Sequence, residues 1–106
     1  MIYLTASEIN NRKNNGDSIT IIDIREPYEV ETASIESVKI PMGDIENHLE
    51  ELKKMDQIVL MCRSGKRAES VANWIESEYG IQQIIVMEGG ICQWKDQVNP
   101  LLALED

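Results

Sequence analysis

Short apolar runs alternate with helical patterns along this 106-residue chain. Apolar, β-branched runs of this length suit buried strands, and helices between such strands argue for an α/β domain with a mainly parallel sheet. Strands are predicted over residues 2–4, 18–24, 38–40, 57–61 and 84–87. Helices are predicted over residues 6–14, 27–31, 44–54 and 64–78, with a last helical turn that runs through Trp94.

Polar residues stand at the ends of three of these apolar runs. Asp23 and Arg25 close one run, and Cys62 and Glu88 follow two others. The carboxyl ends of parallel strands lie along one edge of a sheet, which is where ligands bind in α/β folds. We therefore expect these four side chains to gather at that edge.

The loop at residues 62–67 reads Cys-Arg-Ser-Gly-Lys-Arg and joins a predicted strand to a predicted helix. Unpaired N–H groups and the helix dipole favour negative charge at that junction, so the Cys62 thiol is expected to be partly ionised. Arg63, Lys66 and Arg67 strengthen this bias. The loop is therefore interpreted as a cysteine nucleophile in an anion cradle. The alternatives are a buried, inert thiol and a solvated, basic helix start.

The overall charge limits the partners of this chain. Its net charge is −9, which argues against nucleic acid and anionic membranes, because both need positive surface. Two cysteines do not suggest a secreted disulfide scaffold, and neither a signal-peptide pattern nor a transmembrane-length apolar run is present. We expect a single cytoplasmic domain over residues 1–106, without a metal or cofactor.

Taken in order, the motifs resemble the rhodanese domain family. The match comprises Asp23-Ile24-Arg25, Glu29, Ile35, Ile40-Pro41, Cys62-Arg63-Ser64-Gly65-Lys66-Arg67-Ala68, Glu88-Gly89-Gly90 and Trp94. The resemblance implies a central parallel five-stranded sheet flanked by helices, and sulfurtransferase activity. It implies that Cys62 takes the outer sulfur of a small anionic donor such as thiosulfate, forms a persulfide and releases sulfite. Cyanide, a cellular thiol or a protein would then accept the sulfur.

This chemistry suggests roles for the remaining loop residues. Backbone N–H groups between Arg63 and Arg67, including those of Ser64 and Gly65, can point at the sulfur, and Gly65 permits a tight turn. Arg63 and Lys66 are expected to face the mouth of the site and attract the donor.

Arg67 is expected to turn back towards an acid, either Asp23 or Glu29. Asp23 and Arg25 are predicted to support the loop structurally.

Loop size separates this chain from related cysteine enzymes. Four residues lie between Cys62 and Arg67, whereas the related cysteine phosphatases have a wider loop that fits phosphate. The smaller loop favours a single sulfur atom. One departure from the family is Ala33-Ser34-Ile35, where relatives often have Gly-His-Ile, and there we expect only a change in local packing.

Several readings stay open. The chain could be a persulfide carrier for a dedicated protein acceptor, or a rhodanese-like binding or regulatory module without catalysis. Cys92 could be a packed core thiol or a resolving cysteine for Cys62, and His48 is read as a surface residue. The apolar tail at residues 101–104 could dock on the domain or on a partner.

Overall fold

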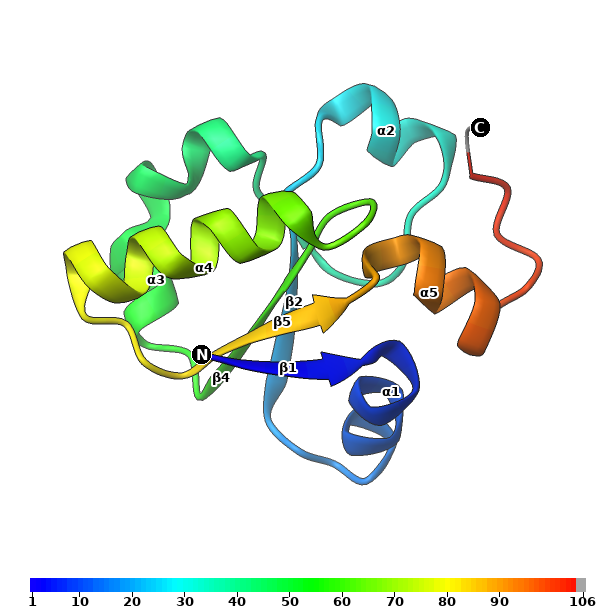
Figure 1. Cartoon of the computed structure of the whole chain (residues 1–106), viewed down its shortest axis with the longest axis horizontal. Coiled ribbons are helices and arrows are strands. Elements are labelled where there is room, and N and C mark those ends of the chain that lie inside the picture. Colours follow the sequence, from blue (N-terminus) through cyan, green and yellow to red (C-terminus); the bar gives the residue numbers. More distant parts are fainter. Residues whose placement is uncertain (105–106) are drawn as a thin grey trace.

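A five-stranded parallel sheet forms the centre of the computed structural model, which describes residues 1–104 (Figure 1). The strand order is β1-β5-β4-β2-β3, and every neighbouring pair is parallel. The predicted α/β class and parallel sheet are therefore confirmed. The strands are β1 (Ile2–Thr5), β2 (Ile19–Asp23), β3 (Val38–Lys39), β4 (Gln57–Met61) and β5 (Ile84–Glu88).

Helices connect successive strands. Local sequence signals set two of the helix ends. Thr5 and Glu8 form the reciprocal capping box at the start of the first helix, and Gly80 ends the long helix in the left-handed conformation. The α-helices are α1 (Ala6–Asn14), α2 (Pro27–Thr32), α3 (Leu49–Lys53), α4 (Lys66–Tyr79) and α5 (Gly90–Gln97).

Three helix predictions need correction. The helix predicted over residues 44–54 is a 3₁₀ helix, η1 (Met42–His48), followed by the short α3. Gly43, Asp44 and Asn47 are weak α-helix formers, which is consistent with a 3₁₀ helix in place of the predicted α-helix. The helix predicted over 64–78 begins at Lys66, because Gly65 has a φ of 102° and lies outside the helical region. The last helical turn is longer than predicted, since α5 continues to Gln97.

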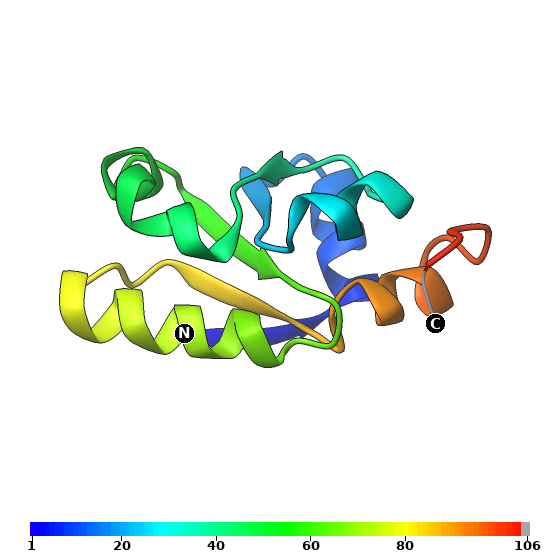
Figure 2. The same cartoon turned by 90° about the horizontal axis from the view of Figure 1, so that it is seen from above.

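Both faces of the sheet are buried, as continuous apolar strands require. Along β4, Ile58 and Leu60 belong to one core cluster, whereas Val59 and Met61 belong to the other. The first cluster packs under α3 and α4, and the second packs under α1 and α5 (Figures 1 and 2). Trp94 is buried in the second cluster, and Trp74 packs against the first.

The carboxyl ends of the central strands carry the residues that the sequence singled out. Asp23 ends β2, Cys62 follows β4, and Glu88 ends β5. These three strands are neighbours in the sheet, so their ends meet at one edge as expected. Within residues 1–104, no helix has both the length and the apolar character needed to cross a membrane.

Candidate active site

The Cys62 sulfur lies inside the turn that joins β4 to α4. Gly65 donates its backbone N–H to Sγ at 3.1 Å, and Ala68 donates its N–H at 3.4 Å. The Cys62 residue is 0% exposed. The turn is therefore a cradle of N–H donors around a buried thiol, an arrangement that stabilises negative charge on sulfur.

The donor set differs in one respect from the sequence prediction. N–H groups were expected from the segment between Arg63 and Arg67, and Gly65 fulfils this expectation. Ala68 lies one residue beyond that segment, in the first turn of α4. The first N–H groups of a helix have no partner within the helix, so the N–H of Ala68 is able to donate to Sγ.

Gly65 has a backbone conformation that other residues rarely adopt. Its φ of 102° directs the N–H towards the sulfur while the chain turns into α4. A Cβ atom at Gly65 would lie 3.4 Å from both the Met87 carbonyl oxygen and the Gly89 nitrogen. The predicted need for glycine at this turn is thus confirmed by the backbone angle.

Backbone hydrogen bonds from the start of α5 hold the Cys62–Arg63 part of the cradle in place. Ile91 donates its N–H to the Cys62 carbonyl at 2.9 Å, and Cys92 donates to the Arg63 carbonyl at 3.2 Å. Gly90 lies so close that a Cβ atom there would collide with the Cys62 and Arg63 carbonyl oxygens. From the sequence, Gly90 was singled out only as part of the family motif, and this supporting contact was not predicted. The available signal was a glycine pair after an apolar strand.

Arg67 turns away from the sulfur and pairs with Glu29. Its Nη1 and Nη2 atoms donate to Oε2 and Oε1 of Glu29, each at 2.9 Å. The Arg67 hydrogen bonds lower the pKa of Glu29, and the Glu29 carboxylate in turn raises the pKa of Arg67. Of the two acids proposed from the sequence, Glu29 is therefore the partner, and the pair ties α4 to α2.

Asp23 pairs with Arg25 instead. Arg25 Nη2 lies 2.8 Å from Asp23 Oδ2, and both residues are buried. The same guanidinium donates to the carbonyl oxygens of Glu29 and Ala33 at 3.3 and 2.9 Å. Arg25 thus holds α2 at its middle and at its C-terminal end, which helps to position Glu29 for Arg67. The segment that lacks the family's histidine is held at Ala33 through its backbone.

The two remaining basic residues lie on different flanks of the cradle. Arg63 is half-buried and lines a small cavity together with Arg25 and Glu29 of the β2–α2 region. Lys66 is exposed and lines a larger hollow that faces β1 and β5. Ser64, between the two flanks, is also exposed.

The C-terminal tail docks on the domain. Leu102 and Leu104 pack against the second core cluster, and Lys95 Nζ donates to the Leu102 carbonyl. Leu104 also lines the small cavity beside Arg63. Leu101 differs from these two leucines, since it is 90% exposed.

Other candidate residues lie apart from the sulfur cradle or contribute only backbone to it. Cys92 is half-buried rather than fully packed, and neither cysteine forms a disulfide. His48 contacts Glu51 at 3.0 Å on the η1–α3 surface. Among residues 1–104, no three His, Cys, Asp or Glu side chains converge as metal ligands would.

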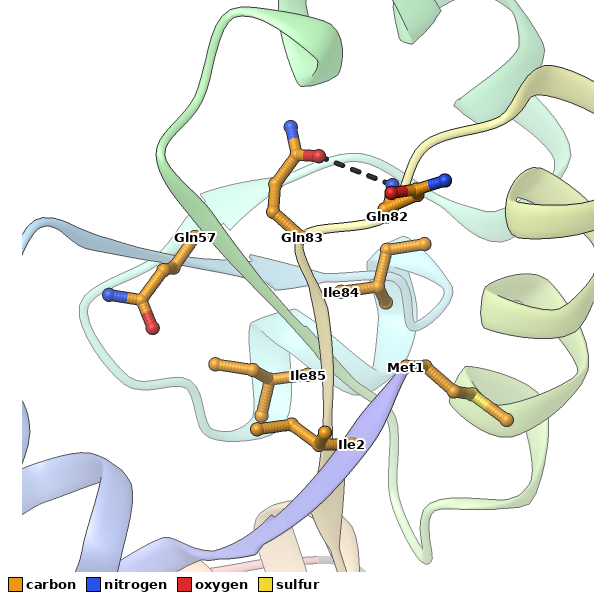
Figure 3. A pocket seen from close by; sticks show the side chains of 7 residues that line it. All are labelled: Met1, Ile2, Gln57, Gln82, Gln83, Ile84 and Ile85. Atoms are coloured by element: carbon orange, nitrogen blue, oxygen red, sulfur yellow. Dashed lines mark hydrogen bonds between the residues drawn. The ribbon is translucent and has the colours of Figure 1, made fainter.

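A separate hollow of about 160 Å³ opens at the opposite end of the sheet (Figure 3). Ile2, Gln57 and Ile84 line it, and each stands at the beginning of its strand. Cys62 follows the carboxyl end of β4, so this hollow and the cradle lie at opposite edges of the sheet.

Comparison with known proteins agrees with this geometry. The rhodanese-like domain family matches residues 5–97. "Putative sulfurtransferase YtwF" of Bacillus subtilis (strain 168) is 36% identical over 85 residues, covering 79% of this chain and 81% of that protein. "Putative sulfur carrier protein YrkF" of the same organism is 35% identical over 79 residues, but these cover only 42% of its length.

Solved structures give the same result. The rhodanese-like domain protein from Staphylococcus aureus matches with a TM-score of 0.81 and 25% sequence identity, and the match covers 100% of both chains. The fold, the order of the motifs and the family match together define the class. This chain belongs to the rhodanese-like domain family.

Proposed function

We propose that this protein is a sulfurtransferase that carries sulfane sulfur as a persulfide on Cys62. The observation that carries the proposal is the pair of N–H donors, from Gly65 and Ala68, around the Cys62 sulfur. The names of its relatives, which include sulfurtransferases and a sulfur carrier, support sulfur transfer in general. Thiosulfate is the proposed donor class, because its transferable sulfur is terminal and its charge suits Arg63 and Lys66.

The proposed reaction has two displacements. The Cys62 thiolate attacks the outer sulfur of thiosulfate, a new S–S bond forms, and sulfite leaves with the electrons of the old S–S bond. A thiophilic acceptor then attacks the outer sulfur of the persulfide. The bond to Sγ breaks, and Cys62 returns to the thiolate without any cofactor.

The cradle residues would stabilise negative charge and would not transfer protons. The N–H groups of Gly65 and Ala68 stabilise the thiolate before the first step and after the second. Arg63 and Lys66 raise the local concentration of an anionic donor against the net charge of −9. Burial of Cys62 favours a donor with a small terminal sulfur, because little else can approach Sγ.

Arg67, Asp23 and Arg25 have positioning roles in this proposal. The Arg67–Glu29 pair holds the first turn of α4, which contains the Ala68 donor. The buried Asp23–Arg25 pair holds α2 in place behind Glu29. None of these three residues donates a hydrogen bond to Sγ among the contacts of residues 1–104.

A second candidate function is a persulfide carrier for a dedicated protein acceptor. The similarity to a protein named as a sulfur carrier favours it. A rhodanese-like module without catalysis ranks last, because Cys62 and its N–H donors are both present.

Sulfite release and thiocyanate formation separate these readings when thiosulfate and cyanide are supplied to the parent protein. Multiple turnovers support the sulfurtransferase. One equivalent of sulfite without turnover supports the carrier. Absence of sulfite with thiosulfate and with other sulfane donors would contradict both, and Cys62→Ser is the control that should release none.

A further inference from the structure

A hollow of about 230 Å³ adjoins the sulfur cradle on its β1 and β5 side. Ser64, Gly65 and Lys66 line it from the loop, and Glu88 lines it from the end of β5. Gly65 belongs to both places, since its N–H contacts the Cys62 sulfur at 3.1 Å. A small molecule in this hollow would therefore be separated from the sulfur by a single residue of the loop.

The charges of the hollow are uneven. Glu69 and Glu88 contribute two carboxylates and Lys66 contributes one ammonium group. Tyr3 donates its hydroxyl to Glu69 Oε2 at 2.7 Å, and this hydrogen bond raises the pKa of Tyr3, so the phenol is neutral. The hollow thus carries a net charge of about −1 from these groups at neutral pH.

Two of these charges are available to a ligand. Within residues 1–104, the side chains of Lys66 and Glu88 form no hydrogen bond or ion pair, and both are exposed. Lys66 comes from the loop end of α4, and Glu88 comes from the end of β5. A ligand with an ammonium group for Glu88 and a carboxylate for Lys66 would pair with both charges.

We propose that this hollow is the acceptor subsite and that it selects a small thiol carrying an ammonium group, an aminothiol of the cysteine type. The inference rests on the proposed function, because it assigns the second displacement to this hollow. The acceptor thiolate attacks the outer sulfur of the Cys62 persulfide and forms a new S–S bond. The bond to Sγ breaks with its electrons on Cys62, and the aminothiol departs as a persulfide.

The proposal separates the two substrates by charge. A net negative hollow disfavours binding of a doubly negative donor, so thiosulfate would enter along the Arg63 flank, and Lys66 would contribute to its attraction only through the long-range field of its ammonium group. The acceptor would approach along the Lys66 and Glu88 flank. Donor and acceptor would thus reach one buried sulfur from different sides of the same loop.

The first test measures discharge of preloaded persulfide by L-cysteine, cysteamine and 3-mercaptopropionate, with rates expressed per thiolate. Cysteine and cysteamine carry the ammonium group, whereas 3-mercaptopropionate carries only the carboxylate. We expect the two ammonium-bearing thiols to be faster, and Glu88→Gln to slow them about threefold, the effect of one exposed ion pair. The rate with 3-mercaptopropionate should not fall. Glu78→Gln, an exposed glutamate at the far end of α4, is the matched control and should change none of the rates.

Equal rates for the three thiols in the parent, or an equal loss for all three in Glu88→Gln, would overturn the proposal. A second test needs no sulfur transfer. S-methyl-L-cysteine, which cannot react, should shift the backbone amide signals of Ser64, Gly65 and Gly89 in NMR titrations, whereas 3-(methylthio)propionate should shift them less. Failure to form any persulfide would defeat the proposed function, whereas equal shifts by the two ligands would defeat the acceptor subsite alone.

Discussion

Gly65 donates its N–H to the Cys62 sulfur at 3.1 Å from a backbone with a φ of 102°. The hydrogen bond therefore depends on a conformation that a Cβ atom disfavours. Gly65→Ala should destabilise the fold by about 1–2 kcal/mol, the cost of a left-handed backbone for an L-residue. It should also slow thiosulfate loading about tenfold or more, since removing a preorganised donor from a reacting centre has effects of that order or larger.

Gly16→Ala is the matched control for this substitution. Gly16 has a φ of 87°, and nothing lies within 4 Å of the position that a Cβ atom would take there. It precedes the beginning of β2, whereas the loop follows the carboxyl end of β4. Thermal unfolding should show a similar loss for both variants, whereas sulfite release should fall only for Gly65→Ala. Equal loading rates in the two variants would mean that the Gly65 donor has no role in the chemistry.

Gly90→Ala should displace the loop without touching its sequence. The added Cβ would collide with the carbonyl oxygens of Cys62 and Arg63, so the first turn of α5 or the cradle must move. We expect a loss of stability of about 1–3 kcal/mol from overpacking, together with slower sulfur transfer. Gly43→Ala has open space around it and should leave both unchanged. Unaltered loading in folded Gly90→Ala would show that α5 does not position the cradle.

The Glu29–Arg67 pair predicts an acid-sensitive contribution to stability. Because Arg67 lowers the pKa of Glu29 in the folded state, the stabilisation is fully present above the unfolded pKa of about 4.3 and is lost as pH falls through the lower folded value. At neutral pH, Glu29→Gln should cost about 1–2 kcal/mol, and the difference from the parent should shrink below about pH 4. Urea unfolding at a series of pH values measures this difference.

Glu31→Gln is the control on the same helix, because Glu31 is exposed and the carboxylate that pairs with Arg67 is that of Glu29. It should show little change in stability at any pH. A Glu29→Gln difference that stayed constant down to about pH 2 would show that the pair does not carry the effect.

Charge reversal tests the recruitment of the donor. Arg63→Glu combined with Lys66→Glu should lower the second-order rate of loading by thiosulfate, because the chain already carries −9. Added salt should narrow the gap to the parent, since the Debye length falls from about 10 Å at 0.1 M to about 3 Å at 1 M. A neutral sulfur donor should lose much less. Equal losses with charged and neutral donors at low salt would assign these residues to loop geometry instead.

The sequence was sufficient for the features that depend on local pattern. Apolar runs buried on both faces, such as 57–61, are readable as strands of a parallel sheet because their neighbours in the chain are helical. Cys62 was identifiable as the candidate nucleophile because its neighbours along the chain supply both the turn and the positive charge.

Features that depend on packing between distant segments were not readable. Arg67 forms its ion pair with Glu29 and not with Asp23, because Asp23 is already paired with the buried Arg25. The clamp of Gly90 on Cys62 joins residues far apart in sequence, and only the sheet order β5-β4 brings them together. The Ala68 donor depended on where α4 begins, and helix starts are poorly defined by composition alone.

Intact-mass spectrometry of thiosulfate-treated protein, followed by peptide mapping without reductant, shows which cysteine carries the sulfur. We expect one added sulfur atom, located on Cys62, in both the parent and Cys92→Ser. Cys62→Ser should fold normally, since the change is nearly isosteric, and should gain no sulfur. Sulfur on Cys92 instead of Cys62, or an undiminished gain in folded Cys62→Ser, would mean that Cys62 is not the residue that carries the sulfur.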